Sequence, residues 1–589
     1  MIKSHCHAWT VLLPGLLLSS ACSQSNTNGA DSSTQGAASS SGSGGAGGSA
    51  GGGSIDAIIP PGRRIDWTTA GVPGGIPART TICATIDASS FGNGAMDASG
   101  AITLAIKNCP PDQVVLLTAG NFSIQNRIEF HYKSNVTLRG AGPDKTVLFP
   151  AGGAIMVGDD AFGPLAATVV GGATKGSTTL TLSSTANLAV GGLLRIDRLN
   201  TPAGPADPTD ADLVHDTLGP QYVAKDPSRR IAQMIVITAI NGDAVTVSPP
   251  LIWDFSASPS LTTFFGVITM SGVEDMKIDH SKGGTGPSII FDQAYGCWAK
   301  NISSYKPGGY HLQSILSVSG EIRDSYFNDS KTYGPDNAGV GFFGANTGWA
   351  IENNVFWKTF PSIELQLGSS GNYIGYNYSY EVMTGAGISG VAFDDNHGAH
   401  DMMNLWEGNS GEMFQVDGYW GSGSHGTLFR NNFTAFNPGT TLNYKAICLN
   451  RWAYYYNIVG NVLGTPSWPA TGQYEIEQDG YSDSIATIYQ LGYPNMGNTS
   501  YTPFDGKSPT GLDAKVKSTL IRYKNYDYFH KAVQTDSAGL PDQPLPASLR
   551  YKSKPAFWPL GASWPPIGPD VKGYVSQIPA EARYMAGIP

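Results

Sequence analysis

The segment between residues 394 and 430 is dense in side chains that could do chemistry. It holds three histidines, a series of carboxylates and Arg430. Histidines and carboxylates exchange protons near neutral pH when their surroundings tune them, and an arginine can neutralise a carboxylate on a substrate. A module that only binds sugar needs aromatic and amide side chains but no such concentration of ionisable groups, so the pattern favours an enzyme.

Two reactions on polysaccharides fit these residue types. β-Elimination of a uronate needs a base and a nearby cation, whereas glycoside hydrolysis needs two carboxylates about 5–5.5 Å or about 6.5–9.5 Å apart. Adjacent Asp394 and Asp395 also offer oxygen ligands to Ca²⁺, although paired aspartates in a polar loop are more often simply solvated. No other cofactor is indicated. The candidate catalytic residues are Glu407, Arg430, His400, His397, Asp417 and His425, and the candidate substrate-binding residues are Asp394, Asp395, Tyr376 and Trp420.

The elements that must position these residues come from a repeat between residues 276 and 461. Each copy is an apolar residue followed three positions later by a small polar residue, most often asparagine. Spacings of 22 to 32 residues between copies indicate a solenoid, whose repeats must stack to bury their apolar faces. The copies begin at Met276, Trp298, Ile322, Ile351, Ile374, Trp406, Phe429 and Ile458.

The repeat predicts strands, because its apolar residues lack the i, i+3, i+4 spacing of a helix. One coil of roughly 23 residues at about 3.3 Å each can hold three short strands and three turns, and stacked coils lie about 4.8 Å apart. The asparagines should then form a ladder that hydrogen bonds from coil to coil. These features predict an all-β, right-handed parallel β-helix; a β-propeller would need about 40–45 residues per blade.

The predicted stacking also brings two candidate residues together. If the first residue of each copy points inward, the second points outward. Glu407 and Arg430 would then face each other on adjacent coils. A solvated ion pair is the plainer interpretation of such a contact. With the neighbouring histidines, however, the pair favours proton abstraction beside a carboxylate.

The N-terminus carries signals for export. Residues 1–22 combine Lys3, an apolar run too short to cross a membrane, and Ser-Ser-Ala-Cys at 19–22. We expect lipidation at Cys22, with ordinary signal-peptide cleavage as the alternative. The Ser- and Gly-rich residues 23–54 predict a flexible tether. The protein should therefore be a bacterial outer-membrane lipoprotein or extracellular, a monomer that meets the membrane only through its lipid.

Net charge and cysteines narrow the prediction further. A formal charge of −10 disfavours nucleic acid as a partner. Export favours a disulfide between Cys83 and Cys109. Cys297 and Cys448 fall within coils, where buried free thiols are expected.

The remaining chain divides into regions of different character. Residues 55–462 should form the β-helix domain, with a short amphipathic helix near residues 101–106 that caps its first coil. Residues 160–255 interrupt the coils with strand-like runs and an Asn-Gly turn, which predict a small β insertion. Residues 463–589 lose the period and should form an irregular region packed on the coils.

A family resemblance supports this architecture. The runs GNGAMDASGAITLAIKNC, VVLLTAGNFSI and VTLRGAGPDKTVL, between Gly92 and Leu148, resemble the N-terminal part of the pectate-lyase-like superfamily of right-handed parallel β-helix proteins. The resemblance implies the fold but not one activity, because the superfamily includes polysaccharide lyases, glycoside hydrolases, epimerases and phage tail spikes. Ile278-Asp279-His280 resembles a pectate lyase motif whose arginine-rich partner is not found here. No catalytic residue is therefore carried over.

The sequence thus predicts an exported, surface-tethered protein that degrades a polysaccharide. The pairing of Arg430 with Glu407 favours β-elimination of a uronate-containing polymer. Glycoside hydrolysis on the same fold is one alternative. A non-catalytic polysaccharide-binding or adhesive β-helix is the other.

Overall fold

The computed structural model describes residues 55–158, 162–165, 167–200, 213–216, 226, 228–332, 338–382, 387–478, 483–493 and 511–587. The predicted leader, the lipidation site Cys22 and the tether therefore lie outside the described residues. Among the helices of the described part, none is long and apolar enough to cross a membrane.

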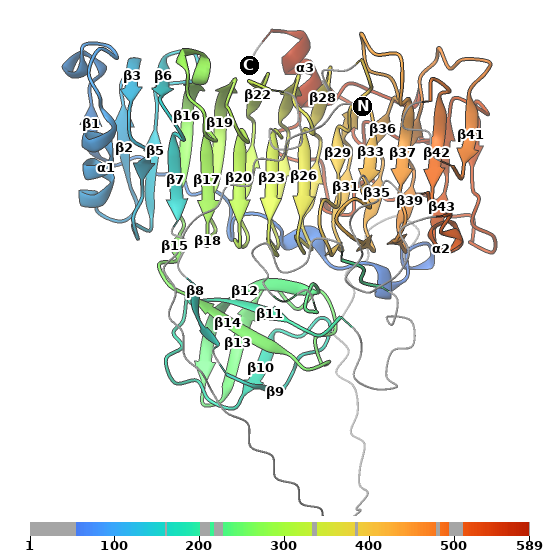
Figure 1. Ribbon diagram of the computed structural model, residues 1–589, viewed down its shortest axis with the longest axis horizontal. Helices are drawn as coiled ribbons and strands as arrows, with labels where there is room; N and C mark the ends of the chain where they lie inside the picture. Colours follow the sequence, from blue (N-terminus) through green and yellow to red (C-terminus); the bar gives the residue numbers. More distant parts are fainter. Residues whose placement is uncertain are drawn as a thin grey trace, which may run out of the picture. The chain divides into compact units, whose positions relative to one another are not determined.

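The chain winds into coils whose strands stack in parallel on three faces, as the repeat predicted (Figure 1). The first face contains β1 (Ile82–Ile86), β2 (Gln113–Leu117), β5 (Val136–Arg139), β16 (Gly272–Asp279), β19 (Trp298–Tyr305), β21 (Glu321–Arg323), β24 (Ala350–Glu352), β27 (Tyr373–Gly375), β31 (Leu405–Glu407), β35 (Thr427–Phe429), β39 (Asn457–Val459) and β43 (Ile521–Tyr523).

The second face adjoins the first, because the long strands β16 and β19 continue across both. Its other strands are β3 (Gly120–Ile124), β6 (Thr146–Pro150), β22 (Tyr326–Asn328), β25 (Val355–Trp357), β28 (Tyr378–Tyr380), β32 (Ser410–Gly411), β36 (Asn432–Phe433), β40 (Val462–Leu463) and β44 (Asn525–Asp527), with β45 (Ala532–Gln534) antiparallel at its end.

The third face is a separate parallel sheet. It contains β4 (Ile128–Glu129), β7 (Ile155–Gly158), β17 (Ile289–Asp292), β20 (Leu312–Ile315), β23 (Val340–Phe343), β26 (Ile363–Gln366), β29 (Phe393–Asp394), β33 (Phe414–Val416), β37 (Lys445–Leu449), β42 (Thr487–Leu491) and β41 (Gln473–Ile476). Short strands pair at the corner between the third and first faces: β15 (Ile268–Thr269) with β18 (Ala294–Tyr295), and β30 (Asp401–Met402), β34 (Gly423–Ser424) and β38 (Ala453–Tyr454).

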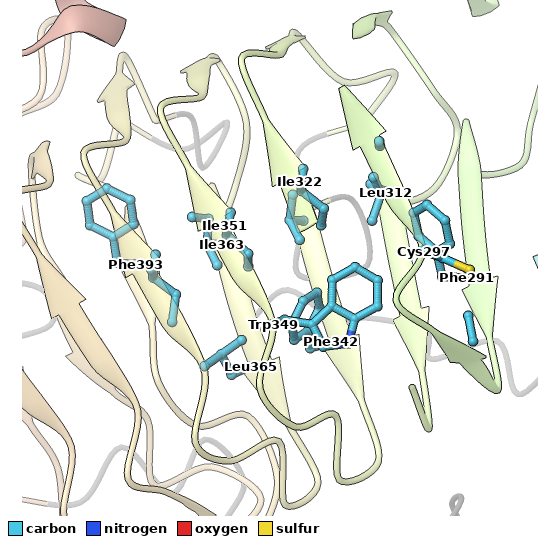
Figure 2. Packing of buried hydrophobic residues seen from close by; sticks show 14 of the residues in the cluster. Phe291, Cys297, Leu312, Ile322, Phe342, Trp349, Ile351, Ile363, Leu365 and Phe393 are labelled. Atoms are coloured by element: carbon cyan, nitrogen blue, oxygen red, sulfur yellow. The ribbon is translucent and has the colours of Figure 1, made fainter. Parts of the chain in front are cut away.

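The core fills the space between the faces with stacked apolar side chains (Figure 2). Trp349 is fully buried, and its ring lies 5.5 Å from that of Phe291 and 5.2 Å from that of Phe342. Ile322 and Ile351 occupy equivalent positions on successive coils of the first face. Each coil therefore shields its neighbours from water, which is why the repeat needs many copies.

The asparagine ladder forms at the turn between the first and second faces. From Asn377 onward, each ladder Oδ1 accepts hydrogen bonds from the backbone N–H and the side-chain Nδ2 of the asparagine one coil earlier, at 2.9–3.0 Å. The members are Asn354, Asn377, Asn409, Asn431, Asn461 and Asn525.

Three of the predicted repeat copies are out of register. Leu428, not Phe429, stacks on Trp406, so Asn431 joins the ladder in place of Asn432. Asn301 lies one position before the ladder column and bonds to the Asp275 carboxylate at 2.7 Å. Asp279 instead accepts the backbone N–H of Ser281 at 2.9 Å at the end of β16.

The β insertion is an antiparallel sheet. Its strands are β8 (Phe162–Leu165), β9 (Val169–Gly171), β10 (Thr179–Leu182), β11 (Leu193–Asp197), β12 (Ala232–Asn241), β13 (Ala244–Ser248) and β14 (Ser260–Phe264). It meets the coils through hydrogen bonds, including one from the Met234 backbone N–H to Thr347 Oγ1 at 3.1 Å. The sheet ends later than the predicted boundary at 255, because β14 pairs with β11 inside it.

The chain ends differ in part from the expectation. A helix α1 (Ser99–Asn108) forms beside the first coils and buries Ile102 and Ile106, while its role as a cap stays a prediction. Coils continue through β43 and β44, beyond the predicted boundary at 462. Helix α2 (Ala514–Ser518) comes just before β43, and the chain after β45, which includes helix α3 (Pro579–Met585), covers outer surfaces of the coils.

The cysteines are placed as the sequence indicated. Cys83 and Cys109 form a disulfide with their Cα atoms 5.5 Å apart. Cys297 and Cys448 are free and buried. The disulfide joins the end of α1 to β1, the first strand of the first face.

Candidate active site

The third face carries a compact cluster of ionisable side chains on its outer surface. Ile363 and Leu365 pack in the core, so the intervening Glu364 and the following Gln366 point outward. In the parallel register, Glu364 lies beside Asp394 on the next coil. The stacking of coils thus brings together two carboxylates that lie 30 positions apart in the sequence.

Glu364 is held by two neutral donors. Tyr310 donates its hydroxyl to Oε2 at 3.1 Å, and Gln366 donates Nε2 to the same oxygen at 2.5 Å. Only 1% of the Glu364 side chain is exposed. Burial raises the pKa of Glu364 to about 7, while the charge of His397 and these hydrogen bonds act in the opposite direction.

Asp394 ends β29 and also points outward. Its Oδ1 accepts the backbone N–H of Asn396 at 3.2 Å and that of Asp417 at 3.4 Å. Burial and the nearby Asp417 carboxylate raise the pKa of Asp394 well above its usual range. The surroundings therefore favour the protonated form of Asp394 at neutral pH.

His397 completes the cluster from the turn after β29. Its backbone N–H donates to Leu365 O at 2.9 Å, which fixes the turn against β26. Its Nδ1 lies 2.5 Å from Asp417 Oδ2 and 3.9 Å from Glu364 Oε1. Burial lowers the pKa of His397, but the two carboxylates outweigh it and raise the pKa to about 10, so the imidazole is a cation at neutral pH.

Aromatic side chains flank the cluster where it reaches the surface. His397 keeps 19% of its side chain exposed and lies next to the rings of Tyr419 and Trp420, at 6.2 and 6.5 Å between centroids. Those two rings contact each other at 4.6 Å. Aromatic faces of this kind stack on the apolar faces of sugar rings.

The cluster also bears on the calcium prediction. Among the described residues, Glu364, Asp394 and His397 each offer a possible ligand atom within 4.8 Å of the others. A histidine binds a metal only when neutral, whereas His397 is protonated and engaged by Asp417. Asp394 and Asp395 cannot share an ion as expected, because Asp395 points inward and bonds with Asn404 at 2.9 Å.

Three other candidate residues, Asp395, His400 and His425, are buried inside the coils and have structural contacts. Asp395 accepts the Tyr456 hydroxyl at 3.1 Å, besides its bond with Asn404. His400 lies between Ser422 Oγ and Ser424 Oγ, each at 2.8 Å, and burial lowers the pKa of His400 to about 3. His425 is also buried, with Nδ1 at 2.9 Å from Ser424 Oγ. These side chains fill the corner between the third and first faces.

Glu407 and Arg430 do not form the pair that the repeat predicted. In the observed register Glu407 lies beside Phe429, because the copy begins one residue earlier than expected. Arg430 instead binds the Asp570 carboxylate, with Nη2 at 2.8 Å from Oδ2. Both residues fasten the C-terminal segment to the coils.

Tyr376 shares that structural setting. Its hydroxyl donates to Glu407 Oε1 at 3.0 Å and accepts from Trp564 Nε1 at 3.1 Å. Leu549 donates its backbone N–H to Glu407 Oε2 at 2.8 Å. Of the ten candidates, the structure therefore brings Asp394, His397, Asp417 and Trp420 together and places Glu407, Arg430, Tyr376, Asp395, His400 and His425 elsewhere.

Glu364, Gln366 and Tyr310 were not among the candidates. They lie in segments that the tetrapeptide repeat does not include. One signal was available: Ile363-Glu364-Leu365-Gln366 alternates apolar and polar residues and so predicts an outward carboxylate on a half-buried strand. Its partner on the next coil could be found only from the register.

The chain is a parallel β-helix, as its stacked parallel strands show. No family model matches the sequence, and no curated protein matches it.

Solved structures resemble it at low sequence identity. They include the tailspike gp61 of Pseudomonas phage phi297 (13% identity, 67% of this chain and 72% of that chain, TM-score 0.38). The tailspike gp49 from Pseudomonas phage LKA1 has 12% identity over 67% of this chain and 70% of that one, with a TM-score of 0.38. An alginate lyase from Paenibacillus sp. strain FPU-7 has 12% identity over 69% of this chain and 98% of that chain, with a TM-score of 0.32. Identities this low do not indicate a particular activity.

Proposed function

We propose that the protein degrades a polysaccharide by glycoside hydrolysis at the cluster on the third face. The observation that carries the proposal is the approach of the Glu364 and Asp394 carboxyl oxygens to within 4.8 Å of each other. Retaining glycosidases keep their two carboxyl groups about 5–5.5 Å apart, whereas inverting enzymes need about 6.5–9.5 Å to admit a water molecule. The short separation favours retention.

The two carboxyl groups have distinct roles in this proposal. Asp394, whose protonated form is favoured, donates its proton to the glycosidic oxygen as the bond breaks. Glu364, in its ionised form, attacks the anomeric carbon and forms a covalent glycosyl ester. Asp394, now a carboxylate, then removes a proton from the water that hydrolyses this ester, which restores both groups.

His397 and Asp417 support this arrangement. The imidazolium of His397 lies between the carboxylates of Asp417 and Glu364 and favours the ionised form of Glu364. The Asp417 carboxylate in turn favours the proton on Asp394. Both pKa values are raised, that of Asp394 well above its usual range and that of Glu364 to about 7, so near neutral pH the protonated form of Asp394 is favoured while part of Glu364 is ionised.

β-Elimination is less well supported than the sequence indicated. That preference depended on Arg430 standing beside Glu407 to neutralise a uronate carboxylate, and Arg430 is bound to Asp570. Hydrolysis of a neutral sugar needs no such cation. A non-catalytic binding role would leave the raised pKa values of Glu364 and Asp394 without a use.

The test is a turnover assay of the mature domain on neutral and acidic polysaccharides, with and without EDTA. Reducing ends and ultraviolet absorbance are followed together. Hydrolysis should release reducing ends without absorbance, because only elimination leaves an unsaturated uronate. Growth of both signals would reject the proposal in favour of a lyase. If neither reducing ends nor absorbance increases while the protein still binds a polysaccharide, a non-catalytic role is assigned.

Export and surface tethering are part of the same proposal. The sequence of residues 1–54 supports a lipid-anchored or secreted protein, and the Cys83–Cys109 disulfide fits an oxidising compartment. A polysaccharide too large to enter a cell would then reach the enzyme outside it. Labelling of the protein with a radioactive fatty acid, lost in a Cys22→Ala variant, tests the anchor.

A further inference from the structure

A second groove lies on the first face, away from the proposed active site. It encloses about 670 Å³. Its floor is formed by outward side chains of β19, β21 and β24, which stack as Lys300, Arg323 and Glu352 on successive coils. This volume lies within the range of about 300–1,000 Å³ that is typical of small-molecule sites.

Three separate parts of the chain build the walls. Residues 68–76 form one wall, residues 248–250 at the end of β13 form another, and Arg550 with Tyr551 of the C-terminal segment closes a third side. Gly71 lies directly on the floor, where a Cβ atom would come within 3.2 Å of Glu321 Oε2. The groove is therefore a product of the tertiary fold.

The cations of the groove are held in place. Arg550 donates Nη1 to Trp67 O at 2.8 Å and Nη2 to Ala70 O at 2.7 Å, and its guanidinium stacks on the Tyr373 ring at 4.5 Å. A cation that is already fixed can attract an anion with little loss of conformational entropy.

Arg323 is positioned in a similar way. It binds Glu321 through Nη1 at 3.0 Å and Asp324 through Nε at 2.8 Å. The Glu352 carboxylate lies 3.9 Å away and also accepts the Tyr551 hydroxyl. The two floor carboxylates are thus engaged by groups inside the groove.

Lys300 differs from the two arginines, because no hydrogen bond within the described part of the chain holds its side chain. It is exposed on the floor, and no hydrogen bond or ion pair joins its side chain to another residue of the described ranges. The charge of Arg323 is balanced by Glu321 and Asp324 at 3.0 and 2.8 Å. Lys300 therefore keeps a positive charge available to a ligand in the groove.

We propose that this groove binds the carboxylate of an acidic sugar unit, with Lys300 as its main charged contact. The hydroxyl groups of Thr68, Thr69 and Ser319 line the same space and can bond to sugar hydroxyls. Tyr551 offers an aromatic surface for the ring. The site would hold an acidic portion of a polymer while the third face acts on a neutral linkage, although its binding does not depend on that activity.

Calorimetric titration of the full-length protein with sodium glucuronate and with glucose tests the proposal. Glucuronate should bind and glucose should not. Lys300→Gln should weaken glucuronate binding about tenfold or more, because a charge-assisted hydrogen bond is lost. The matched control is Lys306→Gln. Lys306 does not line the groove, and its Nζ is paired with Asp329 Oδ2 at 3.2 Å. It should leave binding unchanged.

Other results would overturn the proposal. Equal binding of glucose, no binding of glucuronate, or equal affinities of the Lys300→Gln and wild-type proteins would each do so. Tighter binding of phosphate or sulfate, lost in Lys300→Gln, would reject the sugar carboxylate and assign a small inorganic anion. Glu364→Gln should not change glucuronate affinity, so a failure of the hydrolase proposal remains distinguishable.

Discussion

His397 Nδ1 lies 2.5 Å from Asp417 Oδ2, although the two residues are 20 positions apart in the chain. They meet because one coil of the solenoid separates them and both occupy the edge of the third face. The contact holds a protonated imidazole between Asp417 and Glu364. This bridge acts on the pKa values of both Glu364 and Asp394, and several of the following expectations depend on it.

Replacing either reacting carboxyl group should remove activity and leave the fold intact. Asp394→Asn should lower kcat by about 10²–10⁴-fold, the usual contribution of general acid–base catalysis. Glu364→Gln should be at least as damaging, because the glycosyl ester cannot form. Initial rates of reducing-end release and circular dichroism melting curves provide the measurement.

A buried carboxylate on another face supplies the control. Glu407→Gln should keep kcat near the wild-type value, since Glu407 binds Tyr376 and the backbone of Leu549. Thermal stability should fall, because the C-terminal segment loses charge-assisted hydrogen bonds. Loss of activity with unchanged stability would return Glu407 to the list of catalytic candidates.

The stereochemistry of the product should show retention. Oxygens of Glu364 and Asp394 come within 4.8 Å, which is shorter than the separation of about 6.5–9.5 Å that inverting enzymes use. Proton NMR of the first anomer released from an oligosaccharide substrate measures this directly. Inversion would contradict the assignment of Glu364 as nucleophile.

Activity should rise with pH through about 7. The pKa of Glu364 is about 7, and only the ionised carboxylate can act as a nucleophile, so activity is lost as the pH falls below that value. A flat profile between pH 5 and 9 would contradict this role. The profile of kcat against pH is the measurement.

Removing the histidine bridge should move that profile. His397→Asn deletes the cation that favours ionised Glu364, so the rise in activity should shift to higher pH. His131→Asn is a suitable control, because 57% of the His131 side chain is exposed. An unshifted profile in His397→Asn would mean that the imidazolium does not act on Glu364.

The asparagine ladder allows a matched test of stability. Asn431→Ala should lower the free energy of unfolding by about 1–3 kcal/mol, since it leaves buried amide partners unpaired. The adjacent Asn432 lies outside the ladder and bonds to Ser410 Oγ at 3.1 Å. Asn432→Ala should therefore cost clearly less in chemical denaturation. Equal losses would argue against the ladder as a stabilising element.

The recurring tetrapeptide was sufficient to predict stacked coils, because a short strand that cannot bury its own apolar side must repeat. It was insufficient for register. A shift of one residue moves a side chain to the other side of a strand, and the copy at Leu428 rather than Phe429 removed Arg430 from the column of Glu407.

The same limitation separates the candidate residues. Asp394 and Asp395 are neighbours in sequence and equally suited to chemistry, yet alternation places one on the outer side of the sheet and the other in the core. The density of ionisable residues in the sequence directed attention to the loop that contains the proposed site. It could not distinguish the proposed proton donor from a buried structural acid.

The sequence by itself determined the solenoid, the ladder, the insertion and the disulfide pairing, because each follows from local periodicity, turn chemistry or export. Only the tertiary structure decided the site. Glu364 comes from one coil, Asp394 and His397 from the next and Asp417 from the one after, and stacking at fixed register makes them adjacent. Burial between coils then sets their pKa values, and burial is a property that no single segment of the chain possesses alone.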